Sequence, residues 1–341
     1  MFTHSRRACA SSRREKQPIR RDLIAGCIHS GSWARWLIAA AMVVVSAPAQ
    51  AHGIVGNRVF PGTLAFDDPA VMDELVLPLS RLKHTGEGTD VMDDRIGWSF
   101  TRLLTSTLAF EAESGWLHRN LGSSQRLGFD TTALGLKGLL YKNELHEVMI
   151  SAGLAWGIGG SGAQGVGANN PNTLLPGIFF GKGFGDLPNS LSWLRPFAIT
   201  GAVTLEHPMT ATSTNLGIDP QTGQLGLIAT RDVDITHWGF SIQYSTYYLT
   251  SRFTPGKLPK DEPLYQFIPL VEFAFDTPRG EKTAATMNPG LAYVADAWQV
   301  AAEAIVPLNS PGGRTIGVRA HLFLFLDDLI PAVFGKPLLG P

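Results

Sequence analysis

The chain has 341 residues, of which 44% are hydrophobic and 17% charged, with 37 glycines and two cysteines. This composition excludes a disordered chain, a collagen and a small disulfide-stapled domain, and it leaves one or two ordinary domains. Residues 1–51 hold eight Lys or Arg and two acids, so the rest of the chain keeps 20 basic and 27 acidic residues, a net charge of −7. That balance argues against nucleic acid as a partner, because its recognition requires clustered positive charge.

Residues 1–51 have the organisation of a cleaved secretory signal. A basic stretch precedes the apolar run 36–45, and Ala49 and Ala51 then give the small-x-small pattern of a signal-peptidase site. The run is too short to cross a bilayer as a helix, which takes about 20 apolar residues. We therefore predict that residues 1–51 are removed and that the mature chain begins at His52.

Two other export signals compete with this interpretation. Residues 24–27 (Ile-Ala-Gly-Cys) match a lipoprotein box, although no apolar core precedes them. Arg20 and Arg21 could belong to a twin-arginine signal, although about fourteen residues separate them from the apolar run. Both cysteines, Cys9 and Cys27, lie in the segment expected to be removed, so the mature chain would have none for disulfides, thiol catalysis or metal binding.

Residues 52–94 are expected to form an N-terminal periplasmic segment. Asp68-Pro69 could cap and start a helix of one or two turns. Residues 74–81 give a candidate first strand despite Pro78.

From about residue 95 to residue 326, apolar residues alternate with polar or small ones in segments of eight to fourteen residues. In residues 233–248, for example, Trp238 and Tyr248 fall on the apolar parity, while Ser241 and Gln243 fall on the polar one. Acidic residues on the polar parity would face bulk water in a soluble sandwich, but the lumen in a transmembrane barrel.

Three features favour the barrel: strands of about ten residues, aromatic residues near strand ends, and short connections that alternate with long ones. We predict an all-β fold, a transmembrane antiparallel up-and-down β-barrel of about 12 strands, with ten as the alternative. Short turns would face the periplasm and long loops the exterior, with residues 327–341 forming a C-terminal periplasmic tail.

Charged side chains on the polar parity define the candidate lumen. They could form an electrostatic constriction that favours cations or weakly basic solutes, although any small barrel fills its interior with paired polar side chains. The candidate constriction comprises Glu111, Glu113, Glu147, Glu272, Asp276, Glu303, Arg319 and His321, with Lys137 on the same face.

The signal, the cysteine-free alternating strands and openings such as residues 98–105 (Trp-Ser-Phe-Thr-Arg-Leu-Leu-Thr) resemble the bacterial outer-membrane barrels named after the phenol meta-degradation pathway. The likeness is one of pattern and covers residues 95–326. It implies a monomeric, transporter-like barrel in the cell outer membrane that contacts lipid, small solutes and the barrel-assembly machinery, without a cofactor. Such barrels usually end on an aromatic residue, whereas sixteen residues follow Phe325 here.

Two motifs could indicate chemistry, but their contexts argue against it. Residues 157–162 satisfy G-x-G-x-x-G after a predicted strand, yet the residues that follow cannot readily form the helix of a dinucleotide site. His237 shares a face with Ser241, but that face is the inferred lumen, and no G-x-S-x-G elbow occurs. We therefore predict that the protein is not an enzyme.

His52 offers a different function. An N-terminal His can chelate copper through its amine and imidazole, and His52-Gly53 resembles the start of bacterial copper-dependent polysaccharide monooxygenases. Nothing after Gly53 supports that family, and the other mature histidines show no ligand spacing. A periplasmic copper-binding protein is thus one alternative, and a non-conducting barrel with a binding or structural role is another. The favoured function is a passive or facilitated channel for small solutes, among them cationic or aromatic ones, gated by loop 157–168 or by the N-terminal segment.

Overall fold

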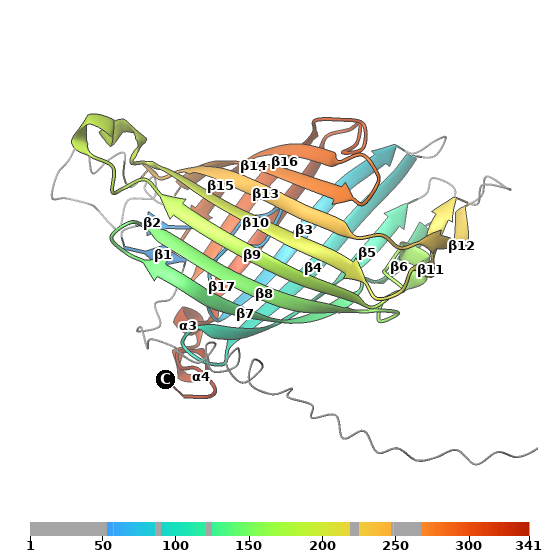
Figure 1. Ribbon diagram of the computed structural model, residues 1–341, viewed down its shortest axis with the longest axis horizontal. Coiled ribbons are helices and arrows are strands. Elements are labelled where there is room, and N and C mark those ends of the chain that lie inside the picture. The colour runs from blue at the N-terminus through green and yellow to red at the C-terminus, as the bar shows by residue number, and fades with distance from the viewer. Residues whose placement is uncertain are drawn as a thin grey trace, which may run out of the picture. The chain divides into compact units, whose positions relative to one another are not determined.

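Twelve antiparallel strands close into a β-barrel in the computed structural model, which describes residues 53–340 except 57, 86–89, 121–124, 219–224, 247 and 249–266. Each barrel strand pairs with the barrel strands before and after it, and the last one pairs with the first (Figure 1). The barrel strands are β3 (Glu74–Thr85), β4 (Asp90–Leu103), β5 (Leu108–Asn120), β7 (Thr132–Asn143), β8 (Val148–Ile158), β9 (Thr173–Gly183), β10 (Phe197–Pro208), β13 (Ile235–Tyr244), β14 (Phe267–Pro278), β15 (Ala284–Val294), β16 (Trp298–Pro307) and β17 (Gly317–Phe325). The predicted fold and strand number are confirmed.

The outer surface of the barrel is apolar and the inner surface polar. Ile242 is 39% exposed, while the side chains before and after it, Ser241 and Gln243, are buried. Exposed Ile96 and Val318 continue this outer face on other strands. Successive side chains of a strand point to opposite faces, so the alternation in the sequence separates a lipid-facing side from a luminal side.

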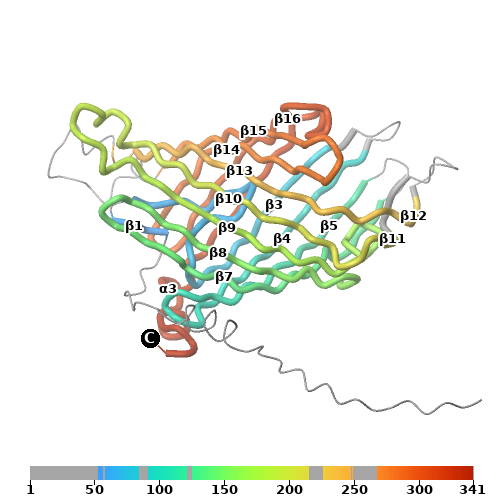
Figure 2. The backbone as a smooth tube through the Cα atoms, viewed as in Figure 1, coloured from blue at the N-terminus to red at the C-terminus, as the bar shows by residue number. Residues whose placement is uncertain are grey.

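Connections differ between the two ends of the barrel. Residues 104–107, 144–147 and 295–297 make tight turns at one end. The other end carries residues 159–172 and 209–234, and the latter contain the hairpin β11 (Thr212–Ile218) and β12 (Leu225–Arg231). Figure 2 shows β1, α3 and the C-terminus at the short-turn end and β11 and β12 at the opposite one. The turn-forming residues of the sequence also predict a short turn at 256–263, which lies outside the described residues.

Strand β3 is a full member of the barrel, so the barrel begins at Glu74, ahead of the main body expected from residue 95. Before it, β1 (Ile54–Val55) and β2 (Arg58–Val59) form a small hairpin, and the chain then runs inside the barrel to Asp73. We call residues 53–73 the plug. Its side chains join the wall in a buried cluster that comprises Val55, Phe60, Ala70, Met72, Met149, Ala198, Phe323 and Phe325.

The helix expected to start at Asp68-Pro69 does not form. Instead the Asp68 carboxylate accepts the N–H of Ala70 at 2.7 Å within an irregular turn. The Ser151 hydroxyl of the wall donates to the carbonyl oxygen of Pro69 at 2.9 Å, so the wall pairs a backbone group that a helix would have paired internally.

Two short helices, α3 (Leu326–Leu329) and α4 (Pro331–Phe334), follow β17 at the short-turn end. Arg102 connects this tail to the barrel, because its guanidinium donates to the carbonyl oxygens of Val333 (3.0 Å) and Lys336 (2.9 Å). The same guanidinium contacts the buried Asp73 carboxylate at 2.5 Å. No helix among the described residues is long and apolar enough to cross a bilayer.

Candidate functional site: the plugged lumen

The backbone of the plug is held by charged side chains of opposite sign from the barrel wall. The fully buried carboxylate of Glu272 accepts the N–H groups of Leu64 (3.0 Å) and Ala65 (2.7 Å). From β17, Arg319 Nη1 donates to the carbonyl oxygen of Leu64 at 2.6 Å. Hydrogen bonds to ionised groups are stronger than neutral ones, so these contacts fix the middle of the plug.

Gly62 lies so close to the wall that a residue with a side chain would not fit there. The Gln299 amide accepts its N–H at 3.1 Å and donates to its carbonyl oxygen at 3.0 Å. A Cβ on Gly62 would lie 2.5 Å from the Phe323 ring. The close approach therefore requires glycine at this position.

Lys137 ties the plug to the opposite side of the lumen. Its ammonium lies 2.6 Å from the Asp67 carboxylate and 3.9 Å from that of Glu111. The side chain is 1% exposed, and its Nζ sits over the Phe179 ring at 4.7 Å from the centroid. A buried ammonium requires such partners, since an unpaired charge inside a protein is costly.

Arg58 anchors the start of the plug at the short-turn end. Its guanidinium donates to the carbonyl oxygens of Arg195 (2.6 Å) and Pro196 (3.0 Å) and pairs with Glu147 at 3.3 Å. Tyr248 adds a hydroxyl hydrogen bond to Glu147, and its ring lies 4.2 Å from the guanidinium. Tyr248 follows the end of β13, so its predicted place on the apolar strand face is wrong.

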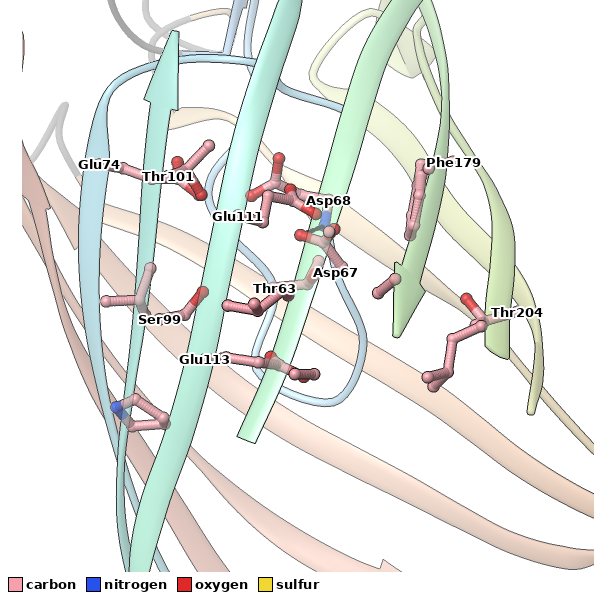
Figure 3. Close-up of a pocket in the computed structure, with 18 of the residues that line it drawn as sticks. Thr63, Asp67, Asp68, Glu74, Ser99, Thr101, Glu111, Glu113, Phe179 and Thr204 are labelled. Atoms are coloured by element: carbon pink, nitrogen blue, oxygen red, sulfur yellow. Dashed lines mark hydrogen bonds between the residues drawn. The ribbon is translucent and has the colours of Figure 1, made fainter. Parts of the chain in front are cut away.

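A cavity of about 310 Å³ lies beside the plug (Figure 3). In the figure, Asp67 and Asp68 of the plug lie next to Glu111, and Glu74 extends toward them from β3. Burial raises the pKa of Asp68, against the opposing attraction of Lys137. The polar residues that line the cavity are Thr63, Asp67, Asp68, Glu74, Ser99, Thr101, Glu111, Glu113, Thr204 and His321.

The predicted constriction residues fall into separate places. Six of them face the lumen, namely Glu111, Glu113, Glu272, Glu303, Arg319 and His321. Within that group, Arg319 lies 3.3 Å from Glu303. Glu147 instead occupies the turn after β7 with a φ of +48°, and Asp276 pairs with His237 at 2.6 Å toward the long-loop end. Their joint action as a constriction stays a prediction.

The sequence suggested the N-terminal segment as a gate, but it did not indicate that this segment lies inside the barrel. It also did not indicate the contacts of the plug, which include Arg58, Asp67, Asp73, Glu74 and Gln299. Residues 53–73 show no period of two or 3.6, so no face could be assigned to them. The one available signal was the density of Pro, Gly and acidic residues ahead of the first strand.

The other candidates from the sequence are a copper ligand, a Ser-His pair and a glycine-rich motif. His52 lies outside the described residues, and the described part of the chain has no group of three or more His, Cys, Asp or Glu arranged to hold a metal ion. The ring nitrogens of His237 contact Asp276 and Glu206 rather than Ser241. The glycine-rich residues 157–162 lead from β8 into a loop with one short 3₁₀ helix, η1 (Gln164–Val166).

Known proteins resemble the chain in structure but not in sequence. No protein-family model and no curated protein matches it, so the resemblance to the phenol meta-degradation barrels has no support from sequence. The COG4313 outer membrane channel from Pseudomonas putida F1 is 10% identical, over 78% of this chain and 99% of its own, with a TM-score of 0.48.

Two further channels show a similar extent of likeness. The KdgM porin in complex with disordered oligogalacturonate is 11% identical, over 74% of this chain and 98% of its own, with a TM-score of 0.41. The CymD monoaromatic hydrocarbon channel is 10% identical, over 75% of this chain and 89% of its own, with a TM-score of 0.34. These likenesses assign no solute to this chain.

Proposed function

We propose that the protein is an outer-membrane channel for small solutes whose lumen is gated by the plug. The single observation that carries this proposal is the pairing of luminal polar side chains with the plug backbone. Glu272, Arg319 and Gln299 each bond to backbone groups of the plug. Water or a polar solute can replace such bonds, so residues 61–66, which lie between Phe60 and Ala70 of the buried cluster, can leave these positions.

The two ends of the plug are held differently from its middle. Arg58 at the start and Asp73 at the end are buried and paired. Breaking a buried pair costs about 3–5 kcal/mol, whereas exchanging a hydrogen bond to a charged group for one to water costs about 1.5–3 kcal/mol. Asp67 is paired with the buried Lys137 ammonium, and Phe60 and Ala70 pack in the buried cluster. We therefore expect residues 61–66 to move as a strap while the contacts on both sides stay in place.

Planar-bilayer recording of the purified barrel tests the gate. The double variant Glu272→Ala with Arg319→Ala removes three plug contacts and is expected to open more often than wild type. Gln243→Ala is the matched control, because Gln243 is a buried luminal side chain that bonds to Thr200 of the wall. Equal opening of the double variant and wild type would contradict the gate.

The constriction is tested separately by ion selectivity. Replacing Glu272 and Glu303 with Gln is expected to reduce cation preference, and an unchanged reversal potential would refute their role. A folded barrel that passes no solute in either test would favour the alternative, a non-conducting barrel with a binding or structural role.

The proposal includes export and location. We infer that residues 1–51 are cleaved, that the barrel is inserted as a monomer by the outer-membrane assembly machinery, and that the short turns face the periplasm. Unheated and boiled outer-membrane samples should migrate differently in a detergent gel, because closed barrels stay folded there. Recovery of the protein in the soluble periplasm would instead direct attention to copper binding at His52.

A further inference from the structure

Carboxyl groups outnumber basic groups around the cavity beside the plug. Five of its lining residues are acidic, and none of the described lining residues is Lys or Arg. Lys137 supplies one positive charge at its edge through Asp67 and Glu111. Arg95 of β4 pairs with Asp130 at 3.0 Å, so this ion pair adds no net charge to the surroundings of the cavity. Uncompensated carboxylates in an enclosed space are costly, so this arrangement favours a positively charged occupant.

Glu74 provides an acceptor that the protein leaves unused. The residue is 7% exposed, and its Oε1 accepts a hydrogen bond from Thr101 Oγ1 at 3.3 Å. Its Oε2 is buried and has no hydrogen-bond partner among the described residues. Figure 3 shows this side chain extending from β3 toward Glu111. A buried carboxylate oxygen without a partner is uncommon, and a donor from a ligand would satisfy it.

The rest of the lining indicates an organic cation rather than a metal ion. A volume of about 310 Å³ lies at the small end of ligand pockets, which hold molecules of several heavy atoms. Val76, Leu175 and Phe179 supply apolar walls. Phe179 already has the Lys137 ammonium above its ring, which shows that the ring can face a cation.

We propose that this cavity binds a small organic cation, an ammonium group on a compact apolar or aromatic body. The ammonium lies between Glu74 and Glu111 and donates to the free Glu74 oxygen, while the apolar body packs against Phe179 and Leu175. The inference rests on the proposed channel function, for which the bound cation would be a transported solute. It names the solute class of that channel.

Equilibrium binding to the purified, detergent-folded barrel tests the site. The probe is benzylamine, which is protonated at pH 7, and calorimetry compares it with benzyl alcohol, benzoate, MgCl₂ and CaCl₂. We expect saturable binding of benzylamine, with Glu74→Gln and Glu111→Gln each lowering the affinity about tenfold, since hydrogen bonds to charged groups have that effect. Glu144→Gln is the control, because Glu144 lies on an exposed turn outside the cavity.

A second variant covers the case in which a buried substitution prevents folding. Glu113 is exposed and lines the cavity, so we expect the Glu113→Gln variant to fold, as judged by the gel shift on heating. We expect this variant to bind benzylamine with about threefold lower affinity. No saturable binding up to about 10 mM, or equal binding of benzyl alcohol, would overturn the proposal. Displacement of benzylamine by equimolar Ca²⁺ or Mg²⁺ would overturn it in favour of an inorganic cation.

The two proposals fail in different ways. Benzylamine binding without conductance or flux would keep this site and reject the channel. Solute flux through a barrel that does not bind benzylamine would keep the channel and reject the cation site.

Discussion

Replacing Gly62 with alanine should release the plug, because the new methyl group can be accommodated only if the plug moves. The Cβ would lie 2.5 and 2.8 Å from two carbons of the Phe323 ring, whereas carbon atoms in contact are about 3.5 Å apart. The ring is 3% exposed and packs against Phe325 at a centroid distance of 5.4 Å, so it has little room to rotate.

The size of the effect follows from the cost of overpacking. Extra methyl groups in a packed site cost about 1–3 kcal/mol, and this cost applies only while Gly62 stays against Phe323. Movement also strains the two hydrogen bonds to Gln299. A penalty of about 2 kcal/mol would raise the ratio of displaced to seated plug about 30-fold, since 1.4 kcal/mol is a factor of ten.

Single-channel recording measures this ratio as open probability, and limited proteolysis measures it as cleavage within residues 61–66. Gly226→Ala is the matched control, because a Cβ there meets no atom within 4 Å. Adding Phe323→Leu to Gly62→Ala should restore part of the seated state by making room. If the Gly62→Ala barrel opens as often as wild type and is cleaved at the same rate, the steric argument is refuted.

Three further predictions concern the ends of the chain. Arg102→Ala should destabilise the folded barrel by about 3 kcal/mol, because it leaves the buried Asp73 carboxylate without its partner and removes the tail contacts. The temperature at which the gel shift occurs measures this loss of stability, and an unchanged temperature would contradict the prediction. Burial raises the pKa of Asp327 to about 6, with Asp328 adding to the shift. The folded state therefore binds the proton of the Asp327 carboxyl group more tightly than the unfolded state does. The stability that this proton contributes is present below about pH 4 and is lost as the pH rises through 6. Proteolysis of residues 327–340 should accordingly be faster at pH 8 than at pH 5, and Asp327→Asn should remove the difference. Mass spectrometry of the mature protein should give His52 as its first residue, and any other first residue would reject the cleavage site.

The sequence by itself determined the barrel and the direction of its side chains. Side chains of a strand alternate strictly, and lipid accepts only an apolar face, so the parity of Trp238 and Ser241 was enough to assign outside and inside. Turn-forming residues between the apolar segments predicted about 12 strands and left ten as the alternative. The same alternation assigned Glu272, Glu303 and His321 to the luminal face, where the structure has them.

Only the tertiary structure decided what fills the lumen. The plug has no periodicity, and its partners are distant in sequence: Leu64 bonds to Glu272 across 208 residues, and Gly62 to Gln299 across 237. Closure of the barrel, in which β17 pairs with β3, brings these groups together. The same closure places Glu74 of β3 and Phe179 of β9 around one cavity. Local patterns specify faces and turns, but contacts between an irregular segment and a closed wall depend on the whole fold.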